Sequence, residues 1–415
     1  MDQTSEAAVG VGSDREVAPI VRQQQQQPQR SASTTSVIVV EDYEPFQTSA
    51  LLRATLGLQH HHHTEYLGPT TTFEPCLFGN AKDQNITTRN GTLRNVGPGI
   101  TFSVKSDQKT RDHENDVEVL DAIEQIVAPH GKALVDIYFR IVHPSFPILD
   151  KAVFLEKHAR SHREFSPPCL GGVYILASTW WSYSAESSNL PVPDVKALVA
   201  LASKSLNDIV YRPKLSSIQG FLLLSQHDGG ESWERTAQMI ATGQTLGLHL
   251  DCSDWDIPIW EKGLRKRLAW ANYIQDKWSA LVHGWPAKIS DDDWLVPPMM
   301  ENDFEEREVG EAEDDQVSSE IDQGRMVFTN MATLSEILSE LLQAFYTLRA
   351  MKDLSQHLNA AQLVLERAKP IQLKLKEWHA ALPEDLRMDN TKDQRLSSTS
   401  KFYSSVELIT TIMLI

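Results

Sequence analysis

Apolar residues recur every three or four positions over most of the chain after residue 114, a spacing typical of helices with one buried face. Pro144 should end the first such helix near His143, because a proline disfavours helical backbone in the residue before it. Asp150 is placed to cap a helix that starts around Lys151, and Asp194 to open another. The helix that ends near His143 should bury one apolar face, which consists of Leu134, Ile137, Tyr138 and Ile141.

The densest apolar stretch is Trp233–Pro297, which predicts two buried helices joined by a loop. The second helix should cover about residues 260–283 and end at Gly284, because glycine readily adopts the left-handed conformation that stops a helix. Gly247 lies one turn from the end of the first helix, where the missing side chain should let another helix approach closely. Upstream, residues 172–181 are apolar on nearly all sides and predict a fully buried helix.

The C-terminal part begins with a segment, 301–324, that is almost devoid of apolar residues and should be a mobile acidic loop. A heptad-like stripe follows, and we interpret it as a helix packed in the same domain, with a short coiled coil as the alternative. The chain ends on Ile415 inside an apolar helical run, which predicts that it is a C-terminally truncated fragment. The stripe consists of Met331, Leu334, Leu338, Leu341, Phe345 and Leu348.

Three regions follow from these patterns. Residues 1–48 are rich in Gln and Ser and should be a disordered leader, because they cannot bury enough apolar area to fold. Residues 49–114 should be a partly ordered strap and linker. Residues 115–415 should form one large helical domain. No strand-rich region is apparent, so the predicted fold class is all-α.

Charge and cysteine content limit the class of protein. The net charge of −17 argues against a basic surface over the whole protein for nucleic acid. Glu301–Asp322 alone holds eleven acidic residues and one basic residue, so the rest of the chain is only mildly acidic. Cys76, Cys169 and Cys252 are far apart, which excludes a disulfide framework and a closed zinc site and favours the cytosol or nucleus. Neither a signal peptide nor a membrane span is apparent, so no membrane partner is expected.

Few residue groups suggest chemistry, and none forms a catalytic set. Asp291–Asp293 lack the acidic residue at the fifth position that a helical magnesium motif needs, since Leu295 stands there. His249 and Asp251 are better explained as helix-capping groups than as an acid–base pair. We therefore expect no enzyme, no metal site and no cofactor in this chain. Two histidine groups are interpreted as solvated, His60–His63 as a polar run and the pair His158 and His162 as part of a helix face. Arg265 and Arg267 of the basic run Arg265–Arg267 should pair with neighbouring acidic residues.

Five motifs, in family order, resemble the regulatory region of fungal zinc-cluster transcription factors. They are Y-F-R-I-V-H-P-S-F-P-I-L-D from Tyr138, M-I-A-x-G-Q-x-L-G-L-H-x-D from Met239, and R-x-R-L-A-W-x-x-Y-I-x-D-x-W from Arg265, with D-D-D-W-x-V-P and W-H-A-A-L-P after them. The resemblance covers roughly residues 115–415. The strap E-Y-L-G-P-T-T-T-F-E-P-C-L-F from Glu65 is similar to the co-regulators of nitrogen-source utilisation within that family.

The resemblance implies a nuclear transcription regulator with an all-helical regulatory domain. It implies dimerisation, or partnership with other transcription factors, and a possible small-molecule effector. Zinc and direct DNA binding cannot be transferred, because the family's six-cysteine cluster is absent from this sequence. The motif residues would then be structural. They are His143, Pro144, Phe146, Pro147, Gly247, Leu248, His249, Asp251, Trp270, Asp276, Trp278, Gly284, Pro286 and Trp294.

Two other functions remain open. A helical scaffold could hold partner proteins through the stripe Met331–Leu348 and the acidic loop. A magnesium-dependent helical enzyme would instead use Asp291–Asp293.

Overall fold

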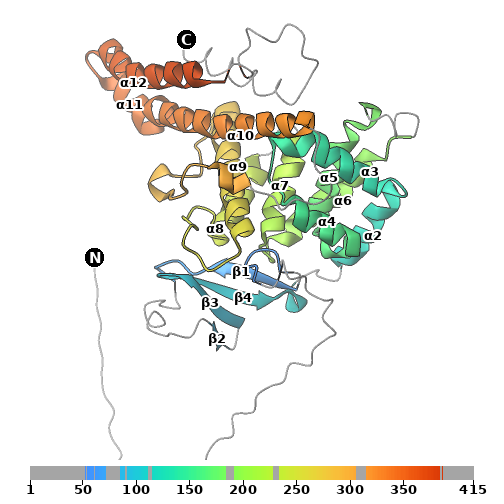
Figure 1. Cartoon of the computed structure of the whole chain (residues 1–415). Coiled ribbons are helices and arrows are strands. Elements are labelled where there is room, and N and C mark those ends of the chain that lie inside the picture. The colour runs from blue at the N-terminus through green and yellow to red at the C-terminus, as the bar shows by residue number, and fades with distance from the viewer. Residues whose placement is uncertain are drawn as a thin grey trace, which may run out of the picture. The chain divides into compact units, whose positions relative to one another are not determined.

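The computed structural model of the chain describes residues 52, 54–59, 61–71, 85–88, 91–110, 115–183, 191–227, 233–304, 315–383 and 386. The predictions for residues 1–48 and for the end of the chain lie outside these residues. The helices are α2 (Asn115–Val127), α3 (Gly131–Ile137), α4 (Lys151–Arg160), α5 (Pro167–Ser178), α6 (Val195–Ile209), α7 (Leu215–His227), α8 (Trp233–Thr245), α9 (Ile259–His283), α10 (Asp315–Leu341), α11 (Leu348–Gln356) and α12 (Ala360–Ala381) (Figure 1). The all-α expectation is confirmed from α2 onward.

The predicted buried helix is α5, and every one of its residues is buried. It packs between α6 and α7, and α2 and α3 cover its remaining sides. Two adjacent glycines make this close packing possible. A Cβ atom on Gly172 would lie 2.6 Å from Leu223, and one on Gly171 would lie 3.0 Å from Ala202. Asp150 and Asp194 accept backbone N–H bonds at the starts of α4 and α6, so both predicted caps are confirmed.

Helix α9 follows its predicted bounds closely. It ends at Gly284, which has a φ of 68° in the left-handed region, as predicted. Gly247 behaves differently from the prediction. Helix α8 has already ended at Thr245, and Gly247 is the left-handed residue that closes it, with the N–H of Leu248 donating to the Gly243 carbonyl at 2.9 Å. The group that approaches Gly247 is the Phe102 ring of the sheet, so no neighbouring helix is involved.

A four-stranded antiparallel sheet occupies the region that was predicted to be strap and linker. Its strands are β1 (His62–Tyr66), β2 (Asn85–Thr88), β3 (Gly91–Gly97) and β4 (Ile100–Ser106), in the order β1-β4-β3-β2. The expectation of no strand-rich region is therefore wrong here. A register shift between Asn95 and Gly97 interrupts the alternation of polar and apolar residues, which conceals the strand pattern.

The sheet has its own apolar cluster beside the ends of α8 and α9. Phe102 is fully buried, and its ring centroid lies 5.4 Å from that of Trp255. Leu56, Val96, Cys252 and Ile257 complete the cluster. Because Trp255 comes from the loop between α8 and α9, the sheet is packed directly against the most motif-rich part of the helical body.

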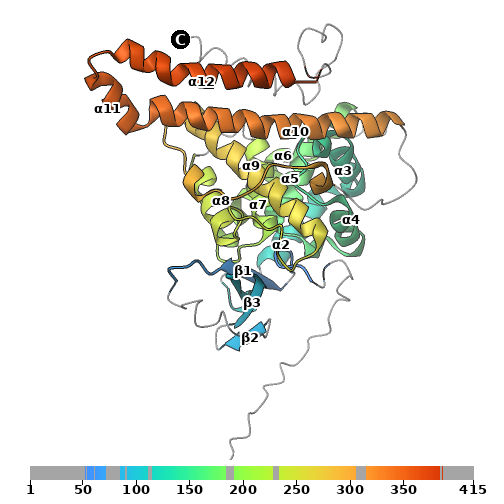
Figure 2. The same cartoon turned by 60° about the vertical axis from the view of Figure 1, so that its left-hand side comes forward.

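Helix α10 contains part of the segment that was predicted to be a loop. Residues 301–304 form a 3₁₀ turn and α10 begins at Asp315, so residues 315–324 are helical and the mobile-loop prediction is wrong for them. The stripe packs within the same body as predicted, because Leu334, Leu338 and Leu341 are buried against α12. Figure 2 shows α12 running alongside α10. Leu348 starts α11 and is 78% exposed.

Gly324 is where α10 crosses the 3₁₀ turn His143–Ser145, and a Cβ atom there would lie 2.3 Å from the Pro144 carbonyl carbon. Gly324→Ala should therefore lower the melting temperature by several degrees, since backbone overlap outweighs the roughly 1 kcal/mol that alanine contributes to an exposed helix. Glu320→Ala, at an exposed position of the same helix, should leave it nearly unchanged. Thermal unfolding of both variants checks this, and a more stable Gly324→Ala protein would contradict the packing.

Candidate functional site

The loop after α9 is held by a buried carboxylate. Asp276 is fully buried and accepts the backbone N–H groups of Lys288 and Ile289 at 2.8 and 2.9 Å. The neighbouring Lys277 ammonium donates to the Ile289 carbonyl at 2.7 Å. Burial raises the pKa of Asp276 against the opposing effect of these N–H donors. The predicted motif residue Asp276 thus fixes the backbone of the loop that follows its own helix.

Asp291 connects that loop to two helices. Its carboxylate accepts hydrogen bonds from the Tyr273 hydroxyl at 2.9 Å and the Ser339 hydroxyl at 2.8 Å, and Lys277 lies 3.4 Å away. Asp291–Asp293 form a 3₁₀ turn. Among the described residues, no group of His, Cys, Asp or Glu side chains is arranged to hold a metal ion. These contacts show Asp291 joining α9 to α10, and they give no support to the magnesium-enzyme alternative.

Aromatic motif residues cover the same surface of α9. The Trp294 ring lies 5.6 Å from Trp270 and 5.0 Å from Tyr273, centroid to centroid, and Trp270 donates to the Pro297 carbonyl. Trp278 faces the other way and donates its indole N–H to Ser335 of α10 at 2.9 Å. The predicted aromatic residues therefore attach the loop and α10 to α9.

The opening motif contacts α10 through Phe146 and has a polar contact of its own between His143 and Leu149. His143 Nε2 lies 3.1 Å from the Leu149 oxygen, and the Phe146 ring contacts Phe328 at 6.2 Å between centroids. Pro147 is buried beside them. Pro286, in contrast, is exposed in the loop after α9.

His249 and Asp251 lie beyond the end of α8, and each bonds to a different part of the protein. The His249 backbone carbonyl accepts from the Leu295 N–H, and its ring packs edge-on to Tyr66 at 6.0 Å. Asp251 caps the turn at Ser253 instead of the helix. Their interpretation as helix caps is therefore wrong, because α8 closes through backbone bonds at Gly247.

His158 and His162 do not share a helix face. His158 lies 3.2 Å from the Tyr174 hydroxyl, whereas His162 follows α4 and lies 2.6 Å from Asp121. Arg265 pairs with the acidic Glu261 as expected, but the recorded bond of Arg267 goes to the Leu149 carbonyl.

Glu261 is the most heavily bonded carboxylate between the sheet and the helices. It is fully buried in the first turn of α9 and accepts the Thr55 hydroxyl at 2.7 Å and the Leu56 and Gly57 N–H groups at 2.9 Å each. Arg265, one turn later, donates to it at 2.9 Å. The sequence analysis missed this residue. The available signal was the i, i+4 spacing of Glu261 and Arg265 in the first turns of α9.

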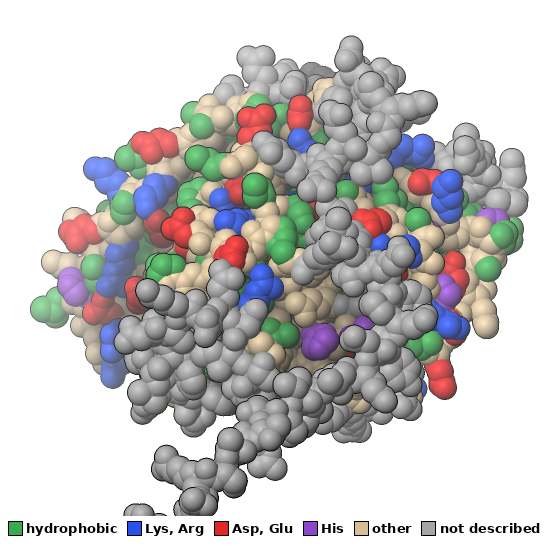
Figure 3. Space-filling view, turned by 60° about the horizontal axis from the view of Figure 1, so that its bottom comes forward, with side chains coloured by type: hydrophobic (Ala, Val, Ile, Leu, Met, Phe, Trp, Pro, Cys, Tyr) green, Lys and Arg blue, Asp and Glu red, His purple; other side chains and the backbone are tan. Residues whose placement is uncertain are grey.

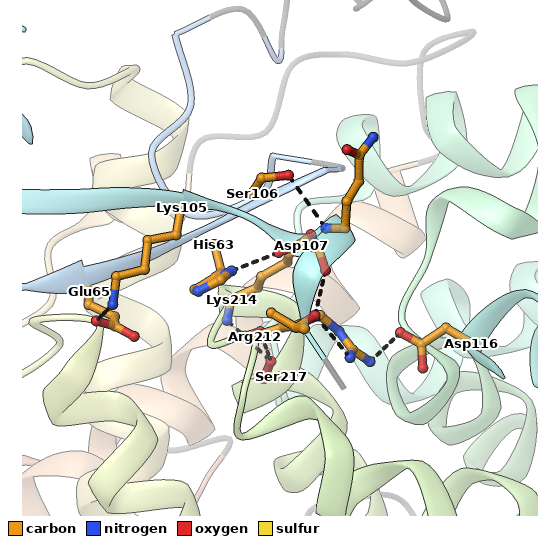
Figure 4. Close-up of polar contacts among 11 residues, drawn as sticks. His63, Glu65, Lys105, Ser106, Asp107, Asp116, Arg212, Lys214 and Ser217 are labelled. Atoms are coloured by element: carbon orange, nitrogen blue, oxygen red, sulfur yellow. Dashed lines mark hydrogen bonds and ion pairs between the residues drawn. The ribbon is translucent and has the colours of Figure 1, made fainter. Parts of the chain in front are cut away.

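A second buried polar group, the Asp107 cluster, attaches β4 to the helical body (Figure 4). We define it as His63, Asp107 and Lys214. Asp107 is fully buried, with His63 Nδ1 2.8 Å from one carboxylate oxygen and the Lys214 ammonium 2.6 Å from the other. His63 comes from β1 and is 4% exposed, so the interpretation of His60–His63 as a solvated run is wrong for this residue. Lys214 is the residue before α7. Nearby, Arg212 donates to Asp116 of α2 at 2.6 Å.

Burial alone would raise the pKa of Asp107, but hydrogen bonds from His63 and Lys214, with the charge of Lys214, hold it below the usual value of 3.8. A carboxylate with a lowered pKa stabilises the fold above the unfolded-state pKa, and this contribution disappears as the pH falls through the lowered value. The Asp107 cluster therefore supports the sheet at neutral pH.

Asp107→Asn should destabilise the protein by about 3 kcal/mol near pH 7, because Lys214 loses its partner in a buried site. The difference from the unchanged chain should begin to shrink below about pH 4, where Asp107 of the unfolded chain takes up a proton, and should be lost as the pH falls through the lowered pKa of the folded protein. Glu65→Gln is a matched control, since the Glu65–Lys105 pair is about one-third exposed and should contribute less than about 1 kcal/mol. Denaturant unfolding across pH measures both, and equal effects of the two substitutions would refute the assignment.

The sequence is similar to that of several fungal transcription regulators. The chain is 34% identical over 377 residues to the transcriptional activator protein DAL81 of Saccharomyces cerevisiae, covering 81% of this chain and 38% of that protein. It is 32% identical over 227 residues to an uncharacterized transcriptional regulatory protein of Schizosaccharomyces pombe, covering 53% and 33%. The transcriptional activator protein acu-15 of Neurospora crassa is 24% identical over 278 residues, covering 63% and 28%.

The chain thus spans about a third of the length of these curated relatives. No solved structure matches it. The model of the fungal specific transcription factor domain matches residues 135–380, which contain the opening motif, α9 and the carboxylate-bonded loop after it. The chain belongs to the fungal specific transcription factor domain family.

Proposed function

We propose that this chain is the regulatory part of a nuclear transcription regulator. The observation that carries the proposal is the family match over residues 135–380. It is supported by the roles of the motif residues, since Asp276, Asp291 and Trp278 join helices and loops to one another. None of the described helices has the length and apolar content needed to cross a bilayer.

DNA contact in this proposal is made by partner factors or by a zinc cluster outside the present sequence. Cys169 and Cys252 are both buried and far apart in the chain, and burial raises the pKa of each thiol. On the described surface in Figure 3, acidic and basic side chains are interspersed, and no continuous basic area is visible on that face. These features favour a protein-binding role over direct phosphate contact.

The similarity to the activator DAL81 extends over most of this chain. We therefore assign the chain to activation, and, with the strap motif around Glu65–Phe78, to regulators of nitrogen-source utilisation. Homodimers, or complexes with other transcription factors, are the partners that this role requires.

A partner surface is available on α11 and α12. The predicted stripe cannot serve, because Leu334 and Leu338 are fully buried. Leu365 and Leu373, in contrast, are 64% and 56% exposed on α12, and Leu358 precedes that helix fully exposed. Exposed leucines at this density favour protein contact. The scaffold alternative would then bind its partners through α12 and not through the stripe.

Fusing residues 1–415 to an unrelated DNA-binding module should raise transcription of a matched reporter several-fold over the module alone. Leu365→Asp should lower this signal several-fold without changing the melting temperature, because it disrupts a partner surface and no core. Ala361→Asp, exposed on the same helix, should not change it.

Two results would count against these assignments. A reporter signal equal to that of the module alone contradicts transcriptional activation. An unchanged signal in Leu365→Asp contradicts the α12 surface and leaves activation intact.

A further inference from the structure

A cavity lies between α4, the start of α5 and the start of α7. Its empty volume, with the open mouth included, is about 360 Å³. Most of its wall is apolar, and Leu58 contributes to it from the segment bonded to Glu261. The apolar lining residues are Leu58, Leu149, Val153, Phe154 and Phe165, and the polar ones are Asp150, Lys157, Glu164, Cys169, Ser216 and Gln219. Leu149 and Asp150, the last two residues of the opening motif, are the part of the sequence motifs that reaches this space.

Lys157 is the unusual member of the lining. It belongs to the last turn of α4 and is only 8% exposed. Within the part of the chain that the structure describes, its ammonium has no hydrogen bond or ion pair. A buried ammonium ordinarily requires such partners. Burial, with the nearby charge of Lys214, lowers the pKa of Lys157 to about 8, so the ammonium form still predominates near neutral pH.

The charged neighbours of Lys157 are occupied elsewhere. Glu164 accepts two hydrogen bonds from Arg160 at 2.7 Å each, and Asp150 caps α4 through the Val153 N–H. Lys214 is bonded to Asp107. Burial raises the pKa of Cys169 to about 12, so this thiol supplies no negative charge. The positive charge of Lys157 is therefore left for a molecule in the cavity.

Gln219, the amide in the polar wall, is already bonded within the protein. The Gln219 amide donates to the Ile148 carbonyl at 2.9 Å, and its oxygen faces the Cys169 thiol. A suitable occupant thus combines one anionic group for Lys157 with a small apolar body for the surrounding phenylalanine, valine and leucine side chains. Hydrophobic walls with one placed charge are common in small-molecule sites.

We propose that this cavity binds a small organic carboxylate with an apolar body of a few carbon atoms, whose carboxylate pairs with the Lys157 ammonium. The site goes beyond the proposed function, and its test uses the purified chain without any transcriptional readout.

The test measures the melting temperature of the full chain with isovalerate or benzoate at millimolar concentration. Either probe should raise it by a few degrees, because a ligand that binds only the folded state stabilises that state. Sodium chloride and sodium sulfate at equal ionic strength should not. The shift should weaken as the pH rises from about 7 to about 9, since binding requires protonated Lys157.

Lys157→Met should abolish the probe effect and raise the melting temperature of the unliganded protein, because a buried unpaired charge is replaced by an apolar chain of similar length. Lys204→Met, exposed on α6, removes the same charge and should change neither quantity. Ser216→Leu keeps Lys157 but occupies space in the cavity, and should also abolish the effect.

The proposal is overturned if neither carboxylate shifts the melting temperature, or if sulfate shifts it equally. It is also overturned if Lys157→Met and Ser216→Leu, when folded, respond to the probes as the unchanged chain does.

Discussion

The segment that leads into the sheet is held on the helical body by one buried carboxylate, Glu261. Such a group is costly to bury without donors, and the penalty amounts to several kcal/mol. Here four donors surround it, three of them from residues 55–57 and one from Arg265. If residues 55–57 left α9, Glu261 would stay paired with Arg265 but would lose three of its four donors in a buried site. Arg265 also donates to the Leu246 carbonyl and lies over the Trp255 ring, so the same pair fixes the end of α8 and the sheet's apolar cluster.

Much of the helical body could be predicted because its signals are local. A capping Asp, a run of apolar residues or a terminal glycine acts within one or two turns, and Asp150, α5 and Gly284 followed those signals. The sheet could not be predicted in this way. Its pairing partners His62 and Ser106 lie 44 residues apart, and the bulge in β3 breaks the alternation that identifies a strand.

The site residues show the same division. The resemblance selected Asp276, Trp270 and Trp294 as structural residues, but it did not show which helix each of them contacts. Glu261, Asp107 and Lys157 were missed because their importance arises from groups far away in the sequence. Asp107 meets Lys214 across 107 residues, and Glu261 meets Thr55 across 206. A charged residue in a sequence carries no mark of whether it will be buried.

Helix α10 has a mechanical consequence that follows from its length. At 27 residues it extends about 40 Å. Its first half rests on the opening motif through Gly324, and its second half carries the contacts of Ser335 and Ser339 to α9 and its loop. A rigid rod of that length, tilted by about five degrees at one end, moves its far end by about 3 Å. Helix α12 is packed along that far half through Trp378 and Ile371. A tilt of α10 near Pro144 would therefore reach the exposed leucines on α12 only if the bonds of Ser335 and Ser339 to α9 and its loop moved with it.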